Sequence, residues 1–132
     1  MTVLSRRTFA SLLVFALAAL GPAAGHAAGT RYDKAAFDRA VAAGGPVVLH
    51  VSADWCPTCK AQKPVVDALL KEPRMKPVQL FVADFDTEKA LKKSLGVEQQ
   101  STFVVFKGGR EVARSTAELD RGAIAHTFAK AL

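Results

Sequence analysis

Residues 47–64 read VVLHVSADWCPTCKAQKP and contain both cysteines of the chain, Cys56 and Cys59. The apolar run before the cysteines is long enough for a buried strand and too short for a helix. After the cysteines, helical periodicity continues as far as Leu70. The cysteines therefore lie where a strand is expected to lead into a helix. They could form a structural disulfide, bind a metal ion or exchange electrons with a substrate.

These three interpretations differ in what they require. A bridge between residues three apart closes so small a loop that it restricts the unfolded chain very little. Zinc takes four ligands, whereas the chain has two cysteines. Copper(I) accepts two soft thiolates and stays a possible alternative. The C-x-x-C spacing between strand and helix favours redox chemistry.

The pattern along the rest of the chain predicts one α/β domain. We expect a mixed sheet with helices on both faces, whose early strands are parallel and whose last two form an antiparallel hairpin at a Gly-Gly turn. Asp33 is a plausible cap of the first helix, and Gly44 and Gly96 end two helices. The expected helices cover residues 33–44, 59–72, 87–96 and 120–132, and the expected strands cover 46–52, 78–86 and the two halves of 102–115.

The first 27 residues have the features of a secretory signal. Arg6 and Arg7 precede an apolar stretch over 12–20, and small residues end the segment at Gly25 and Ala27. The apolar stretch is shorter than the roughly 20 residues that span a bilayer, so we expect cleavage after Ala27 and no stable membrane insertion afterwards. The motif SRRTFA resembles the twin-arginine export pattern, but ordinary signals also contain paired arginines. We thus predict a signal peptide over 1–27, a mature domain over 28–132 and a periplasmic location.

Charge argues against nucleic acid as a partner. The formal net charge of +6 falls to +4 when the two arginines of the signal are removed. The remaining lysines are scattered among acids and do not form a basic stripe interleaved with aromatic residues. We expect a solvated surface and no nucleic-acid partner.

The chain resembles the thioredoxin family in two stretches. Residues 47–64 match the family's apolar strand, its Trp-Cys-x-x-Cys-Lys turn and a helix proline five residues after the second cysteine. The segment LGVEQQSTFVVFKGGREV, residues 95–112, matches the later loop and hairpin. The resemblance implies the thioredoxin fold and a protein dithiol–disulfide oxidoreductase that needs no cofactor and acts on disulfide-containing proteins.

The resemblance also implies roles for the residues of the motif. Cys56 is expected at the amino end of the helix that starts near Pro57, where free N–H groups and the helix dipole stabilise a thiolate nucleophile. Proline suits the first helical position because it has no N–H to lose. Cys59 is the expected resolving thiol and should be the more buried of the two. Trp55 is expected to pack beside the sulfurs.

Two positions depart from the family pattern. The family has a buried acid in the strand before the motif, and His50 stands there in this chain; a histidine can also transfer protons. The family places a cis-proline opposite the cysteines, and Ser101 stands there. Because a cis bond before a non-proline residue costs about 2.5–4 kcal/mol, we expect a trans bond. The serine hydroxyl would stabilise the thiolate or help to hold a metal.

The residues between the cysteines bear on the direction of electron flow. The CPTC motif is similar to that of envelope reductases that serve cytochrome c maturation. Strong oxidases of the same compartment have histidine immediately before the second cysteine, whereas Thr58 stands there in this chain and carries no charge. We therefore predict a reductant that is re-reduced by a membrane donor. The alternative is a copper(I) module built on Cys56 and Cys59 with help from Ser101 or His50.

Overall fold

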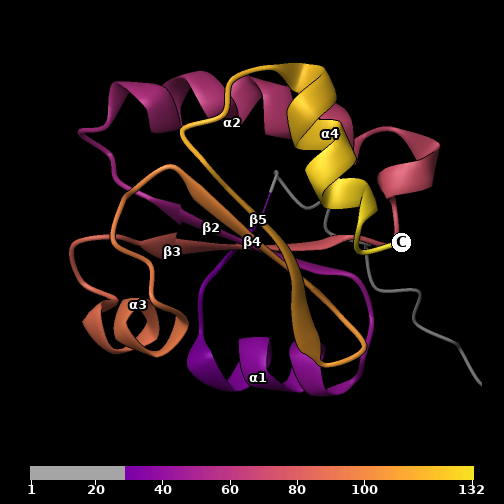
Figure 1. Cartoon of the computed structure of the whole chain (residues 1–132), viewed down its shortest axis with the longest axis horizontal. Coiled ribbons are helices and arrows are strands. Elements are labelled where there is room, and N and C mark those ends of the chain that lie inside the picture. Colours follow the sequence, from indigo (N-terminus) through magenta and orange to yellow (C-terminus); the bar gives the residue numbers. More distant parts are fainter. Residues whose placement is uncertain (1–28) are drawn as a thin grey trace, which may run out of the picture.

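The computed structural model describes residues 29–132 (Figure 1), so the predicted signal over 1–27 lies outside the described residues. The elements follow one another as β1 (Thr30–Arg31), α1 (Lys34–Ala42), β2 (Val47–Ser52), α2 (Pro57–Leu70), a 3₁₀ turn η1 (Pro73–Met75), β3 (Gln79–Asp84), α3 (Lys89–Leu95), β4 (Thr102–Lys107), β5 (Arg110–Thr116) and α4 (Arg121–Ala129). The sequence predicted all of these except the two-residue strand β1 and the turn η1. Both are too short to give a periodic signal.

The five strands form one mixed sheet in the order β1-β3-β2-β4-β5. Strand β3 is parallel to both β1 and β2, while β4 is antiparallel to β2 and to β5. Gly108 and Gly109 make the turn between β4 and β5 with φ of 60° and 81°, a left-handed conformation that glycine adopts without steric cost. The predicted sheet, with parallel early strands and an antiparallel hairpin, is confirmed.

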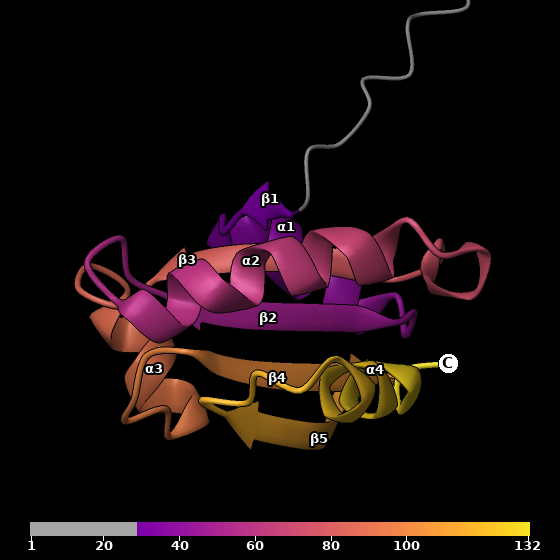
Figure 2. The ribbon, with the colours of Figure 1, turned by 90° about the horizontal axis from the view of Figure 1, so that it is seen from above.

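Helices cover both faces of the sheet, also as predicted. Helices α2 and α4 lie on one face and α1 and α3 on the other (Figure 1), and α2 runs above β2 and β3 while α4 lies over β4 and β5 (Figure 2). Successive residues of a strand point to opposite faces, and β2 shows this directly. Val48 packs in the cluster with α2 and α4, whereas Val47 and Leu49 pack in the cluster with α1 and α3. His50 therefore belongs to the α2 face.

Local signals in the sequence explain where the helices begin and end. Asp33 accepts a hydrogen bond from the Ala36 N–H at 2.8 Å and caps α1. Gly96 ends α3 with φ of 62°, where a residue with a Cβ would be strained. Among residues 29–132, no helix combines the length and the apolar character that crossing a bilayer requires.

Candidate active site

The two cysteines lie at the amino end of α2. Cys56 is the N-cap residue, and its Sγ accepts a hydrogen bond from the Cys59 N–H at 3.1 Å. Pro57 occupies the first helical position, where a missing N–H costs nothing. Because the helix dipole places partial positive charge at this end, the position favours the thiolate form of Cys56. The predicted placement of Cys56 and Pro57 is confirmed.

Ser101 joins the two sulfurs from the opposite side. Its Oγ lies 3.1 Å from Cys56 Sγ and 3.0 Å from Cys59 Sγ. A hydroxyl has one proton to donate, so it can donate to one sulfur while it accepts from the other. In each contact either atom can be the donor, and when Cys56 is a thiolate the Ser101 hydroxyl donates to it.

The prediction that Cys59 is the more buried cysteine is wrong. Cys56 is 2% exposed and Cys59 3% exposed, and both are free thiols. Cys56 loses its exposure because Ser101 covers it, and because Ala53 and the Phe85 ring pack in the same cluster. The two thiols are thus equally shielded from solvent.

The surroundings of Cys56 act on its acidity in opposite directions. Burial raises the pKa of the Cys56 thiol because a thiolate loses solvation. Hydrogen bonds from the Cys59 side chain, the Ser101 hydroxyl and the N–H groups of Cys59 and Thr58 lower the pKa by more, so it lies below its ordinary value. The site therefore stabilises a nucleophilic thiolate.

The backbone at Ser101 has an unusual conformation. No cis peptide bond occurs within residues 29–132, as expected for a serine in this loop, but Ser101 has a positive φ of 61°. A residue with a Cβ pays roughly 1–2 kcal/mol for the left-handed region. Ala117 also has a positive φ, 57°, and its N–H donates to the Ser101 carbonyl at 3.0 Å. Two strained residues therefore face each other where β4 begins and β5 ends.

His50 lies beneath the cysteines on the α2 face of the sheet. It is 5% exposed, its ring packs on Phe103 with 4.5 Å between centroids, and its Nε2 lies 2.9 Å from Gln62 Oε1. Burial lowers the pKa of His50 to about 4, and the hydrogen bond with Gln62 opposes that shift without reversing it. His50 is consequently neutral at pH 7.

His50 should make the stability of the fold depend on pH. The pKa of His50 is about 4 in the folded chain and about 6.5 when exposed, so the unfolded chain binds the proton first as pH falls. This difference predicts a loss of about 3 kcal/mol in the free energy of unfolding between pH 7 and pH 4. Urea unfolding across this range should show a correspondingly smaller loss for His50→Gln. Parallel stability curves for the two proteins would contradict the prediction.

A cavity of about 160 Å³ lies between α2 and strands β2 and β3. His50 and Cys59 both line it, and Lys63 and Asp67, which form an ion pair at 2.8 Å, also border it. A cavity of this volume is large enough to admit water, which the polar side chains in its mainly apolar lining can bind. Cys59 thus shares a space with a neutral imidazole that can accept a proton.

Two predicted site residues remain, Trp55 and Thr58. Trp55 is 56% exposed and its indole N–H donates to Asp86 at 2.8 Å. Phe85 is a partly buried aromatic residue that packs on the cysteine cluster. Thr58 is half-buried in the first turn of α2 and contributes its backbone N–H to Cys56.

Sequence reasoning missed Gln62, which lies at the centre of this site. Its side chain is fully buried, and its Nε2 donates to the carbonyls of Ser101, at 3.2 Å, and Glu118, at 2.9 Å. The signal was present, because Gln62 precedes Val66 by four residues and Leu69 by seven, and therefore lies on the apolar face of α2. A glutamine in that stripe needs buried hydrogen-bond partners.

The arrangement does not favour the copper alternative. Within residues 29–132, no group of three or more His, Cys, Asp or Glu side chains is placed to hold a metal ion. His50, one of the two residues suggested as an additional ligand, has its Nε2 bonded to Gln62. The other, Ser101, offers a hydroxyl rather than a soft ligand.

Comparisons with known proteins agree with the geometry. The family model described as Thioredoxin matches residues 30–130. A thioredoxin from Chlamydia muridarum is 32% identical over 88 residues, which are 67% of this chain and 84% of that protein. Thioredoxin Asp f 29 from Aspergillus fumigatus is 37% identical over 68 residues, 52% of this chain and 62% of that protein, which is less than two thirds of its length.

A solved structure gives the same result. Trxlp from Edwardsiella tarda EIB202 superposes with a TM-score of 0.71 at 40% identity, covering 73% of this chain and 93% of that one. The sheet order, the dithiol at the amino end of α2 and these matches lead to one conclusion. The chain belongs to the thioredoxin family and is a thioredoxin-like protein dithiol–disulfide oxidoreductase, in which Cys56 and Cys59 lie close together at the amino end of α2.

Proposed function

We propose that this protein is exported to the bacterial envelope and there reduces protein disulfides, with a membrane protein as its electron donor. The observation that carries the reductant assignment is the neutrality of the groups around the nucleophile. Within residues 29–132, the groups that lower the pKa of Cys56 are a hydroxyl, a thiol and backbone N–H groups. Strong oxidants depend on a highly stabilised thiolate, usually with a cationic partner. Neutral donors alone favour a more reducing dithiol.

The reaction follows from the placement of the two sulfurs. The Cys56 thiolate attacks one sulfur of a substrate disulfide, so that the substrate S–S bond breaks and a Cys56–substrate disulfide forms. Cys59 then loses its proton and attacks Cys56 Sγ, which releases the second substrate thiolate and joins the two cysteines. Two electrons pass from the dithiol to the substrate, whose two thiolates take up two protons.

His50 is the candidate acceptor of the Cys59 proton. Both side chains line the same cavity. A neutral imidazole has one unprotonated ring nitrogen that can accept a proton. After the transfer the imidazolium carries a positive charge that stabilises the new thiolate on Cys59, whereas a carboxylate that takes the proton becomes neutral.

The redox potential tests the direction of electron flow. Equilibration of the purified mature protein with glutathione buffers should give a potential more negative than about −200 mV, nearer to thioredoxin at about −270 mV than to the oxidant DsbA at about −120 mV. A value above about −150 mV would make the protein an oxidant. Insulin reduction with dithiothreitol as donor provides the matching activity.

Export rests on the pattern of residues 1–27, with its paired arginines, apolar stretch and small residues before the cleavage point. Expression of the full chain in a Gram-negative host should yield a periplasmic protein whose first residue is Ala28. Replacement of Arg6 and Arg7 by lysine should block export if the twin-arginine route is used and should have little effect if it is not. Retention of the uncleaved chain in the cytoplasm would contradict the proposal.

A further inference from the structure

Gln62 connects the buried histidine to the loop that covers the cysteines. Its Nε2 donates to two carbonyl oxygens, those of Ser101 and Glu118, and its Oε1 faces His50 Nε2 at 2.9 Å. A carbonyl oxygen can only accept a hydrogen bond, so both amide protons must point towards the two loops. The orientation of the amide is therefore fixed, and an acceptor atom faces the histidine.

This orientation determines where His50 carries its proton. Because Gln62 Oε1 accepts, His50 Nε2 must donate, and the neutral ring is the Nε2–H tautomer. Nδ1 is then the unprotonated nitrogen. It can accept a proton without breaking the bond to Gln62, which is the property required of an acceptor for the Cys59 proton.

The same amide also holds the strained residue. Ser101 has φ of 61° and its carbonyl accepts from Gln62 and from the Ala117 N–H, so the two bonds fix the peptide that follows the left-handed residue. A strained conformation persists only where its surroundings determine it. The hydroxyl placement between the two sulfurs, at 3.1 Å and 3.0 Å, depends on that backbone.

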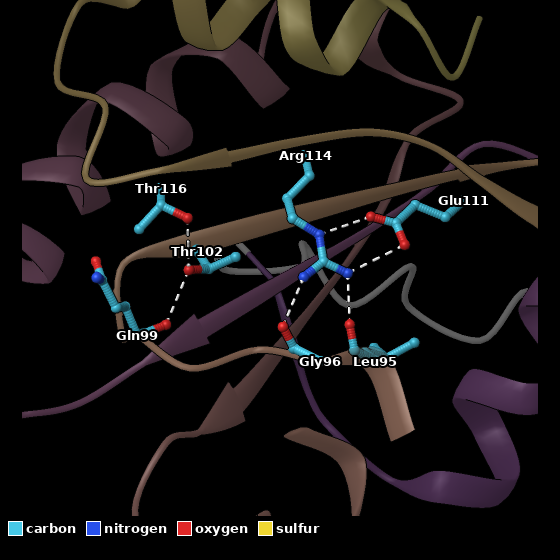
Figure 3. A network of polar contacts seen from close by, with 7 residues as sticks. All are labelled: Leu95, Gly96, Gln99, Thr102, Glu111, Arg114 and Thr116. Atoms are coloured by element: carbon cyan, nitrogen blue, oxygen red, sulfur yellow. Dashed lines mark hydrogen bonds and ion pairs between the residues drawn. The ribbon is translucent and has the colours of Figure 1, made fainter. Parts of the chain in front are cut away.

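A second network braces the same loop without touching Ser101 (Figure 3). The Thr102 hydroxyl donates to the Gln99 carbonyl at 2.8 Å and lies 3.0 Å from Thr116 Oγ1. Arg114 donates to the carbonyls of Leu95 and Gly96 at the end of α3. These contacts hold the two ends of the loop between α3 and β4. Gln62 instead bonds to Ser101, the residue whose hydroxyl contacts both sulfurs.

We propose that Gln62 is a positioning residue of the dithiol site: it sets the Ser101 hydroxyl against Cys56 and Cys59 and fixes the His50 ring as the Nε2–H tautomer. The proposal rests on the dithiol chemistry assigned above and concerns reduction of a disulfide by Cys56 and Cys59. This role is distinct from a contribution to packing. An apolar residue of similar length would fill the space but would supply neither the bond to the Ser101 carbonyl nor the bond to His50.

The test compares Gln62→Met with Thr102→Val. Thr102→Val loses two side-chain hydrogen bonds, with Gln99 and Thr116. Gln62→Met loses three, and it is the only one of the two variants that loses the bond to the Ser101 carbonyl. We expect insulin reduction at pH 7 to fall about tenfold in Gln62→Met, as small misplacements of a reacting group do, and to stay within about twofold of wild type in Thr102→Val. The Cys56 thiolate absorbance near 240 nm should titrate at higher pH in Gln62→Met alone.

A double-mutant cycle shows whether Gln62 acts through Ser101. Ser101→Ala should itself raise the pKa of Cys56, and adding Gln62→Met in that background should change the titration no further. An undiminished effect in the Ser101→Ala background would overturn the proposed route. Equal losses in Gln62→Met and Thr102→Val would show that Gln62 only stabilises the loop.

Ring nitrogen shifts of His50 in the ¹⁵N-labelled wild-type protein test the tautomer without any variant that must fold. Protonation at Nε2 at pH 7 supports the proposal, and protonation at Nδ1 overturns it. The wild-type protein could fail to reduce insulin although its His50 is the Nε2–H tautomer. That result would contradict the proposed direction of electron flow and leave the proposed role of Gln62 intact.

Discussion

Cys59→Ser is expected to trap substrates as stable mixed disulfides on Cys56, whereas Cys56→Ser should trap almost none. Cys56 is the N-cap of α2, and the hydrogen bonds around it lower its pKa, so it is the sulfur that attacks first. Removal of Cys59 leaves that first step intact and abolishes the attack that resolves it. Both variants should lose turnover by on the order of 10³-fold or more, because each removes a participant in the covalent step.

The measurement is capture of proteins from a periplasmic extract under non-reducing conditions, followed by release with dithiothreitol. The double variant Cys56→Ser/Cys59→Ser serves as the control for non-covalent association. Equal capture by the two single variants would show that either sulfur can act as the nucleophile, and the assigned roles would then be wrong. The test has added weight here because the two thiols are equally buried, so exposure alone does not distinguish them.

The fold was predictable because its signals are local and mutually consistent. Asp33 caps α1, Gly96 closes α3, and the Gly108–Gly109 pair turns β4 into β5, all as the sequence indicates. The alternation of core residues along β2 follows from the strand period. Strand β1 escaped prediction because its two residues derive their structure from pairing with β3, a contact between distant parts of the chain.

The candidate site was predictable only in part. The spacing of Cys56 and Cys59 before a helix specifies the dithiol, and the sequence placed His50 and Ser101 near it. It did not indicate that one glutamine joins them, because Gln62 meets Ser101 and Glu118 across 39 and 56 residues of chain. It also did not indicate the bond from Trp55 to Asp86, which lies 31 residues away. Side-chain pairings at this separation leave no periodic trace in a sequence.

Ser101→Pro is expected to destabilise the protein, although the family resemblance alone would suggest a gain. Proline fixes φ near −65°, whereas Ser101 has φ of 61°, so the loop must rearrange to accept the ring. The rearrangement would disrupt the bonds from Gln62 and Ala117 to the Ser101 carbonyl and the bond from Thr102 to Gln99. At about 1 kcal/mol for each of these hydrogen bonds, we expect a loss of about 3 kcal/mol in the free energy of unfolding.

Ser101→Gly and Ser101→Ala separate the backbone from the hydroxyl in the same experiment. Both remove the hydroxyl that contacts the sulfurs, but only glycine adopts a positive φ without steric cost. Ser101→Gly should therefore be more stable than Ser101→Ala by about 1 kcal/mol in urea unfolding of the reduced proteins, while both show a raised pKa of Cys56. If Ser101→Pro were as stable as wild type, the left-handed conformation would not be needed at this position. The loop would then tolerate the family's proline, and serine would matter only for its hydroxyl.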